Sequence, residues 1–160
     1  MTLTYPRLLL SALFTLSLAQ LAFAQDFPQW RGPNRDGIVT GFTAPATWPV
    51  KLKQVWKIQA GAGHASPVIA GQRVYLHSRE GDNELVRAFD LATGKQVWQD
   101  SYAVPYQMNP AAMGHGKGPK STPTLSNGKL YTFGITGTLS AYDANNGKLL
   151  WRKEFKSQFG

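Results

Sequence analysis

The sequence predicts an all-β fold built from two copies of a small, four-stranded antiparallel unit. Three observations predict it. Residues 67–98 and 123–151 repeat one pattern of aromatic, aspartate, glycine and tryptophan positions. The 160 residues include 16 glycines and 10 prolines, which favours many turns and short elements. Beyond residue 24, no stretch shows the spacing of apolar residues that a long helix requires.

The first 24 residues are predicted to be a secretory signal peptide. One arginine, the apolar run LLLSALFTLSLAQLAF and the small-residue sequence Ala22-Phe23-Ala24 are the three parts of such a segment. We expect cleavage between Ala24 and Gln25. A transmembrane anchor is the alternative, disfavoured because Gln20 and hydroxyl residues interrupt the run. Since position 25 is not cysteine, no lipid anchor is expected there, and we predict a periplasmic or secreted protein without a transmembrane helix in the mature chain.

Charge and composition limit the classes of partner and chemistry. The chain has 17 lysines and arginines against 9 acidic residues, a net charge of +8. Because export argues against nucleic acid, the scattered basic residues predict a solvated surface, with an anionic membrane or polysaccharide as the alternative partner. Cysteine is absent, which excludes disulfides, thiol nucleophiles and zinc–thiolate sites.

Each copy begins with a predicted hairpin. The matching patterns are Pro67-x-Ile69-x-x-x-Arg73-Val74-Tyr75 and Pro123-x-Leu125-x-x-x-Lys129-Leu130-Tyr131. Residues 73–76 and 129–132 are rich in β-branched and aromatic side chains, as strands are. Ala70-Gly71-Gln72 and Ser126-Asn127-Gly128 supply the turns, and Asn-Gly is the strongest short hairpin signal.

Each copy continues with two further predicted strands around an aspartate turn. The patterns are Ala88-Phe89-Asp90-x-x-x-Gly94-Lys95-x-x-Trp98 and Ala141-Tyr142-Asp143-x-x-x-Gly147-Lys148-x-x-Trp151. Residues 85–89 and 138–142 are the third strands, and 95–99 and 148–152 are the fourth. The aspartates are expected to accept backbone N–H bonds and the glycines to take positive φ. The first copy is three residues longer, and we expect the difference in a connecting loop at 78–84.

Four strands in about 40–50 residues are typical of a β-propeller blade, with two repeats of a β-sandwich as the alternative. The Ala-[Phe/Tyr]-Asp-x-x-x-Gly-Lys-x-x-Trp signature resembles the pyrroloquinoline-quinone-like (PQQ-like) propeller repeat family over residues 53–151. Residues 29–37 also resemble the start of its secreted members. The resemblance implies that the tryptophan of each fourth strand docks on a neighbouring blade, a role that falls to Trp98 and Trp151.

A third, partial copy precedes the first blade. Lys53-Gln54-Val55-Trp56 is identical to Lys95-Gln96-Val97-Trp98, so 53–59 is expected to be a lone fourth strand that carries a repeat tryptophan, Trp56. Residues 25–52 contain four prolines and predict an irregular lead-in. The propeller region is then 53–160, with blades at 65–101 and 121–155.

Two blades and one strand predict an incomplete ring, because propellers usually have about four to eight blades. We therefore expect the chain to be part of a longer one. The alternative is a two-blade protein that self-associates through its exposed blade edges.

Two loops that precede the blades contain the candidate ligand-binding residues. The long insertion 106–120 contains His115, Lys117 and Lys120, which can present cations to an anionic ligand such as quinone carboxylates. His64 occupies the matching place before the first blade, so we expect both loops at one end of the propeller. Solvated structural loops are the alternative interpretation.

A nucleotide site is not predicted. Residues 114–121 differ from a P-loop at one position, where Pro119 replaces the last glycine and lacks the N–H that would face phosphate. The segment also leads into a predicted strand rather than the helix that a phosphate site requires.

No metal or catalytic residue is assigned from the sequence. His64, His77 and His115 are far apart in the chain. Glu80-x-Asp82-x-Glu84 offers three carboxylates, but it lacks the EF-hand spacing, so we expect a solvated turn rather than a calcium site.

The resemblance leaves two functions open. The first is a scaffold similar to BamB-type outer-membrane assembly factors, which hold protein partners in the cell envelope without a cofactor. The second is the N-terminal part of a quinoprotein dehydrogenase, which would imply PQQ, calcium and an aspartate base. The chain departs from the first by its missing lipid-anchor cysteine and from the second by its lack of an adjacent cysteine pair and of a recognisable calcium-ligand set.

Overall fold

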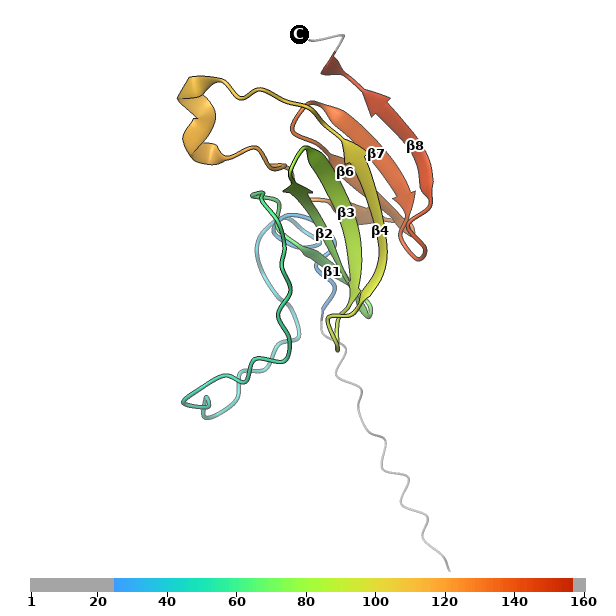
Figure 1. Cartoon of the computed structure of the whole chain (residues 1–160). Coiled ribbons are helices and arrows are strands. Elements are labelled where there is room, and N and C mark those ends of the chain that lie inside the picture. The colour runs from blue at the N-terminus through green and yellow to red at the C-terminus, as the bar shows by residue number, and fades with distance from the viewer. Residues whose placement is uncertain (1–24, 157–160) are drawn as a thin grey trace, which may run out of the picture.

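The computed structural model describes residues 25–156, which form two four-stranded antiparallel sheets (Figure 1). The signal peptide predicted over 1–24 lies outside the described residues. The sheet orders are β1-β2-β3-β4 and β5-β6-β7-β8, so each sheet consists of consecutive strands, and the predicted fold class of four-stranded antiparallel blades is confirmed. The strands are β1 Val68–Ala70, β2 Arg73–Glu80, β3 Asn83–Asp90, β4 Gln96–Ala103, β5 Thr124–Ser126, β6 Lys129–Phe133, β7 Thr138–Asp143 and β8 Leu149–Glu154.

The hairpins show where the two copies differ. Strands β2 and β3 have 8 residues each and pair up to Glu80 and Asn83, which leaves only residues 81–82 as the turn. Strand β6 has 5 residues and β7 has 6, joined by residues 134–137. The extra residues of the first copy therefore lengthen two paired strands. The expectation of a longer loop at 78–84 is wrong because these residues form ladder hydrogen bonds instead.

Backbone conformation explains the turn residues. Asn127 and Gly128 have φ values of 49° and 70°, the two positive angles that a type I′ hairpin turn requires. Asp90 accepts the backbone N–H of Thr93 at 2.9 Å, and Asp143 accepts that of Asn145 at 2.8 Å. These aspartates order the tight turns that return the chain into β4 and β8.

The lead-in is fixed to the sheets at a few points only. Phe27 and Ile69 exchange backbone hydrogen bonds of 2.7 and 3.0 Å, and the carbonyl of Pro28 accepts the Leu125 N–H at 2.7 Å. The lead-in therefore touches the first strand of both blades. Ala62 forms a second isolated bridge, with Arg79.

The lone strand predicted over 53–59 is not formed. Within the described residues this segment belongs to no strand, and the first bridge after it is at Ala62. The identity of residues 53–56 with 95–98 does not suffice, because a strand needs a ladder partner and none lies beside this segment in the described part of the chain.

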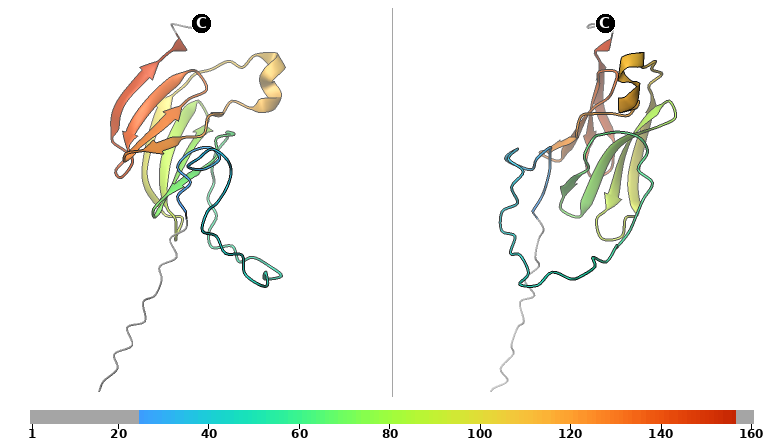
Figure 2. Two further views of the ribbon diagram at one scale, coloured as in Figure 1. Left: turned by 180° about the vertical axis from the view of Figure 1, so that it is seen from behind. Right: turned by 90° about the vertical axis from the view of Figure 1, so that its left-hand side faces the viewer.

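One apolar core lies between the two sheets, which pack face to face in the views of Figure 2. The first sheet contributes Tyr75, Val86 and Trp98, and the second contributes Leu130 and Tyr142. Since all five side chains are buried, the two blades share a core and are expected to fold as one unit.

A long connection joins the blades at one end of the sheets. It contains the short 3-10 helix η1, Pro110–His115, which begins where the Asn109 side chain accepts the Ala111 N–H at 2.9 Å. Across residues 25–156, no helix has the length and apolar character needed to cross a membrane.

Candidate functional site

The interface between the blades is organised by Trp98. Its indole Nε1 donates a hydrogen bond to the carbonyl of Ala144 at 2.9 Å, across the interface. The ring stacks on Tyr142, with 6.3 Å between the centroids and 25° between the planes. The rest of the indole lies on Gly147, where an added Cβ would be 2.5 Å from Trp98 Cδ2. Only a glycine therefore leaves room for the tryptophan at this turn.

Trp56 packs on the first blade in the same way. Its Nε1 donates to the carbonyl of Leu91 at 2.8 Å, and a Cβ on Gly94 would be 2.7 Å from Trp56 Cδ2. The position of segment 53–59 thus comes from its tryptophan rather than from a strand ladder. In both cases the carbonyl acceptor immediately follows the turn aspartate, Asp90 or Asp143.

Trp151 lies on the face of the second blade that is turned away from the first, and it is 40% exposed. It meets Tyr131 with 6.2 Å between centroids and 51° between planes, almost the geometry of Trp98 against Tyr75, 6.1 Å and 47°. Within the described residues no glycine turn lies on it. Its docking on a further blade stays a prediction.

A buried carboxylate joins the two blades. Glu84 is fully buried, and its Oε2 accepts the Tyr102 hydroxyl at 2.7 Å and lies 3.3 Å from His77 Nε2. Its Oε1 accepts the backbone N–H of Ile135, in the second blade, at 2.8 Å. Burial raises the pKa of Glu84, but the hydrogen bonds from His77, Ile135 and Tyr102 outweigh it and leave the pKa below its ordinary value.

The expectation of a solvated turn at residues 80–84 holds for residues 80–83, which are exposed, and is wrong for Glu84, which is buried. Glu84 lies in the second position of β3, and Gly134 of the other blade approaches its carboxylate so closely that any Cβ there would collide with Oε2. The other two acids pair separately, Glu80 with Arg87 at 3.1 Å and Asp82 with Arg79 at 3.0 Å. No sequence signal marked Glu84, because its partners lie on other strands.

A second polar network crosses the same interface. Arg152 of β8 donates to Asp100 of β4 at 2.8 Å and to the Tyr142 hydroxyl at 2.7 Å. Burial raises the pKa of Tyr142 to about 12, with Arg152 opposing and Asp100 adding to the effect. The Arg152 guanidinium also lies 3.8 Å from the centre of the Tyr102 ring, which connects this network to the Glu84 network.

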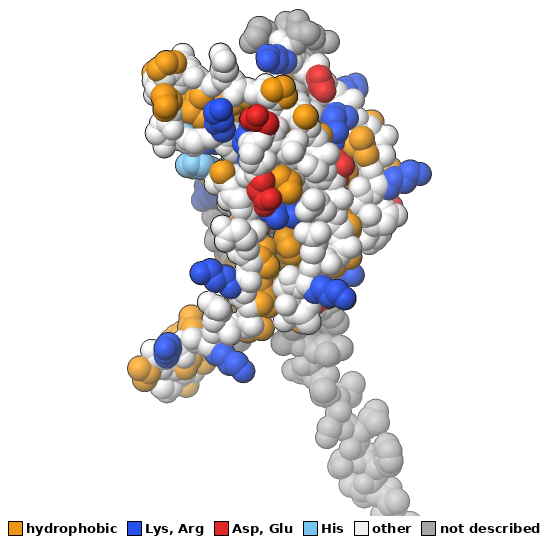
Figure 3. Space-filling view, in the orientation of Figure 1, with side chains coloured by type: hydrophobic (Ala, Val, Ile, Leu, Met, Phe, Trp, Pro, Cys, Tyr) orange, Lys and Arg blue, Asp and Glu red, His pale blue; other side chains and the backbone are white. Residues whose placement is uncertain are grey.

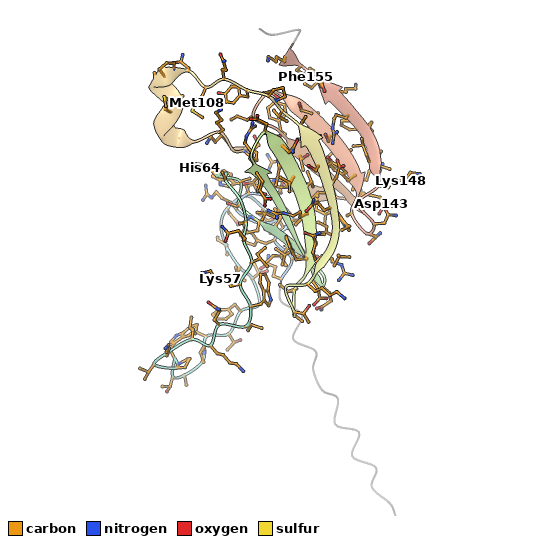
Figure 4. All side chains as sticks on the ribbon, viewed as in Figure 1. Lys57, His64, Met108, Asp143, Lys148 and Phe155 are labelled. Atoms are coloured by element: carbon orange, nitrogen blue, oxygen red, sulfur yellow. The ribbon has the colours of Figure 1, made fainter. Side chains whose placement is uncertain are left out.

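The structure brings together the two loops that were predicted to share one end. The backbone N–H of His64 donates to the carbonyl of Pro119 at 2.9 Å, and the Ser66 N–H donates to the Thr122 hydroxyl at 3.1 Å. Figure 4 shows His64 beside the connection that carries Met108. The contact is made by backbone, however, while the His64 side chain is exposed.

The four candidate ligand-binding side chains do not form one constellation. Lys120 Nζ donates to the carbonyls of His115 and, at 3.0 Å, Gly116, so its ammonium is held by its own loop. Lys117 lines a separate hollow of about 600 Å³ together with Asp82 and Tyr106. Among residues 25–156, no three histidine or acidic side chains gather in a metal-binding group. A role for these loops in binding stays a prediction.

An apolar groove of about 320 Å³ lies between residues 56–65 and the first sheet. Trp56 and Ile58 line one side, and Leu76 and Phe89 line the other. Arg87 connects two lining residues, since its Nη2 donates to the Ala60 carbonyl and to Ser78 Oγ. The groove thus marks where residues 56–65 lie over the sheet without completing a strand ladder.

Comparison with known proteins points to one repeat family. The family model described as outer membrane protein assembly factor BamB matches residues 50–110 and 82–160. The chain is 34% identical over 64 residues to the BamB protein of Shewanella oneidensis. This match covers 40% of this chain and 16% of that protein. It is 29% identical over 111 residues to the lanthanide-dependent methanol dehydrogenase of Methylacidiphilum fumariolicum, which covers 64% of this chain and 17% of the dehydrogenase.

Among solved structures, a europium-containing methanol dehydrogenase matches with a TM-score of 0.47 and 28% identity, over 64% of this chain and 18% of that one. The chain therefore spans less than a fifth of the length of the relatives described above.

Proposed function

This chain belongs to the PQQ-like repeat family whose model is described as outer membrane protein assembly factor BamB, and on that premise we propose that it is a protein-binding scaffold of the cell envelope. Its partners would be polypeptides handled during outer-membrane assembly. The outer face of the second blade, which the repeat resemblance would otherwise assign to a further blade, would supply the contact surface. The predicted signal peptide would deliver the protein to the periplasm.

Exposed apolar side chains of the second blade carry this proposal. Phe133, Leu149, Leu150 and Trp151 are 40–43% exposed. Trp151 forms an aromatic pair with Tyr131 on the outer face of this blade, and tryptophan is enriched among the residues that dominate binding energy at protein interfaces. Trp151 already packs against Tyr131, so binding of a partner would cost little side-chain conformational entropy at this residue.

The two networks between the blades support a scaffold role as well. Glu84 and Arg152 each bond to both sheets and are buried or largely buried. A rigid platform loses little conformational entropy when it binds, so more of the contact energy appears as affinity.

Titration with an unfolded outer-membrane β-barrel protein, diluted from denaturant, tests the proposal. We expect saturable binding that Trp151→Ala weakens about tenfold or more, as for other interface tryptophans. Val97→Ala is the matched control, because Val97 is 41% exposed on the first blade. Absence of binding would overturn the scaffold function, and equal losses in both variants would overturn the assignment of the surface.

A second candidate function is a periplasmic PQQ-dependent dehydrogenase, favoured by the likeness to the methanol dehydrogenase and to a quinohemoprotein alcohol dehydrogenase of Pseudomonas putida. PQQ carries carboxylates, and calcium prefers oxygen ligands. The described residues do not fit this pair, since Lys120 is held by its own loop and no three potential metal ligands gather. In this alternative, further blades would supply the cofactor site. Stoichiometric uptake of PQQ with calcium, followed by dye-linked alcohol oxidation, would establish it.

A further inference from the structure

Residues 38–55 form a projecting arm, which comprises the second half of the lead-in and the start of segment 53–59. Figures 1 and 2 show it standing away from both sheets. It is fixed before and after, because Phe27 is bridged to Ile69 and Trp56 bonds to Leu91. The arm itself contains no strand or helix. It is thus a loop presented to the surroundings from two fixed points.

The arm exposes an unusual set of apolar side chains. Seven of them are between 52% and 108% exposed: Ile38, Val39, Phe42, Trp48, Val50, Leu52 and Val55. Phe42 and Trp48 stack on each other at 6.3 Å between centroids. In Figure 3 the tip of the arm is covered by hydrophobic side chains with basic ones beside them. Single exposed apolar residues are ordinary on a soluble protein, but a concentration of this kind marks an interaction surface.

The charges on the arm and at its root are basic. Lys51 and Lys53 lie within it, and Lys57 lies at its root (Figure 4). The sequence contains no aspartate or glutamate from residue 37 to residue 79. Asp36 lies just before the arm and accepts the Ile38 N–H at 2.9 Å, so one acid faces three lysines. The arm keeps a net positive charge, and its electrostatic complement is an anionic surface.

We propose that the arm binds an anionic membrane surface, with its apolar side chains at the level of the lipid headgroups and its lysines on the phosphates. Tryptophan and phenylalanine favour that interface, and lysine stems extend along apolar surface while the ammonium stays in water. Aliphatic side chains such as Val50 and Leu52 distinguish a lipid from a polysaccharide, which offers them no apolar phase.

The depth of binding follows from the backbone. A segment without helix or strand leaves its N–H and C=O groups to water, and such groups are too costly to bury in hydrocarbon. The arm must therefore lie in the interface without crossing it. This inference goes beyond the proposed scaffold function and does not depend on it, because it requires no protein partner.

Vesicle sedimentation tests the inference with the chain from Gln25 onward, so that the apolar leader cannot contribute. We expect binding to vesicles that contain phosphatidylglycerol, weaker binding to pure phosphatidylcholine, and a decrease with salt. Combined replacement of Lys51, Lys53 and Lys57 by glutamine should lower the partition coefficient on the order of a hundredfold, at about fivefold for each lysine. Phe42→Ser with Trp48→Ser should lower it about tenfold or more.

The matched control replaces Lys129, Lys148 and Lys153, which are exposed on the second blade and carry the same total charge. If this control variant still binds the vesicles, the result supports the arm as the membrane-binding segment. Equal losses in both lysine variants would overturn the proposal in favour of an unspecific net-charge effect. Failure to bind phosphatidylglycerol vesicles would overturn it as well, as would self-association in lipid-free solution that the Phe42 and Trp48 replacements abolish, because the arm would then be a protein contact.

Discussion

Glu84 in the first blade accepts a hydrogen bond from the backbone N–H of Ile135 in the second blade, at 2.8 Å. The same carboxylate accepts the Tyr102 hydroxyl, and Gly134 leaves it the space to do so. A buried carboxylate is stable when its partners hydrogen-bond to it. If the carboxylate is removed, those partners stay buried without an acceptor. This relationship makes the two blades interdependent.

Glu84→Ala is expected to lower the free energy of unfolding by about 3 kcal/mol, because it leaves the Ile135 N–H and the Tyr102 hydroxyl without their acceptor. Denaturant titration measures the change. Glu154→Ala, at an exposed position of β8, should change the value by no more than about 0.5 kcal/mol. Equal effects of the two variants would contradict a special role for Glu84.

Stability is expected to fall in acid because of the same residue. The folded protein lowers the pKa of Glu84 below its ordinary value of 4.5, so the unfolded chain binds the proton more readily. The stabilisation is therefore complete above about pH 4.5 and is lost as the pH falls through the folded pKa. Unfolding midpoints measured across this range should decline less steeply in Glu84→Gln. An unchanged slope in that variant would show that other carboxylates are responsible.

Alkaline conditions should act through Tyr142. Its pKa is raised from 10.0 to about 12 by burial, so its neutral form stabilises the fold fully below pH 10.0. That stabilisation, about 2 to 3 kcal/mol, is lost as the pH rises toward 12. Tyrosinate absorbance should show a group titrating near pH 12 that disappears in Tyr142→Phe, while Tyr75 and Tyr102, whose pKa values burial also raises, remain. Its titration at the ordinary pKa would contradict the buried placement.

Two glycines with similar backbone angles allow the cost of a strained backbone to be measured apart from the cost of a clash with Trp98. Gly147 has φ of 75° and Gly128 has φ of 70°, but only Gly147 lies against an indole, that of Trp98. Replacement of either by alanine should cost about 1 to 2 kcal/mol for the left-handed backbone. Gly147→Ala should cost about 2 kcal/mol more, because Trp98 must move. Thermal unfolding of the two variants gives the difference, and equal values would mean that the indole adapts freely.

Much of the fold could be predicted from the sequence, because each blade is specified by local signals. Asn127-Gly128 marks a hairpin, and the aspartate-to-glycine spacing marks the turn in front of the fourth strand. The identity of residues 53–56 with 95–98 was misleading, since a strand also requires a neighbour with which to pair. Trp56 still packs on the first blade, because its indole requires only a carbonyl to accept its N–H and a glycine to leave room for its ring.

The polar network could not be predicted, for a different reason. Glu84 and Ile135 are separated by 51 residues, and nothing local distinguishes this glutamate from the paired, exposed Glu80 nearby. Burial of an acid depends on how the sheets pack, which no short run of residues specifies. The same holds for Arg152 and Asp100, whose contact crosses the interface.

Hydrogen exchange of the Ile135 amide tests whether the two blades form one unit joined at their polar interface. The structure places this amide in a short link between strands, yet bonded to the buried Glu84. We expect protection as strong as that of the core amides of β3 and β7, and its loss in Glu84→Ala. Rapid exchange of Ile135 in the unaltered protein, at the rate of an exposed loop, would contradict it.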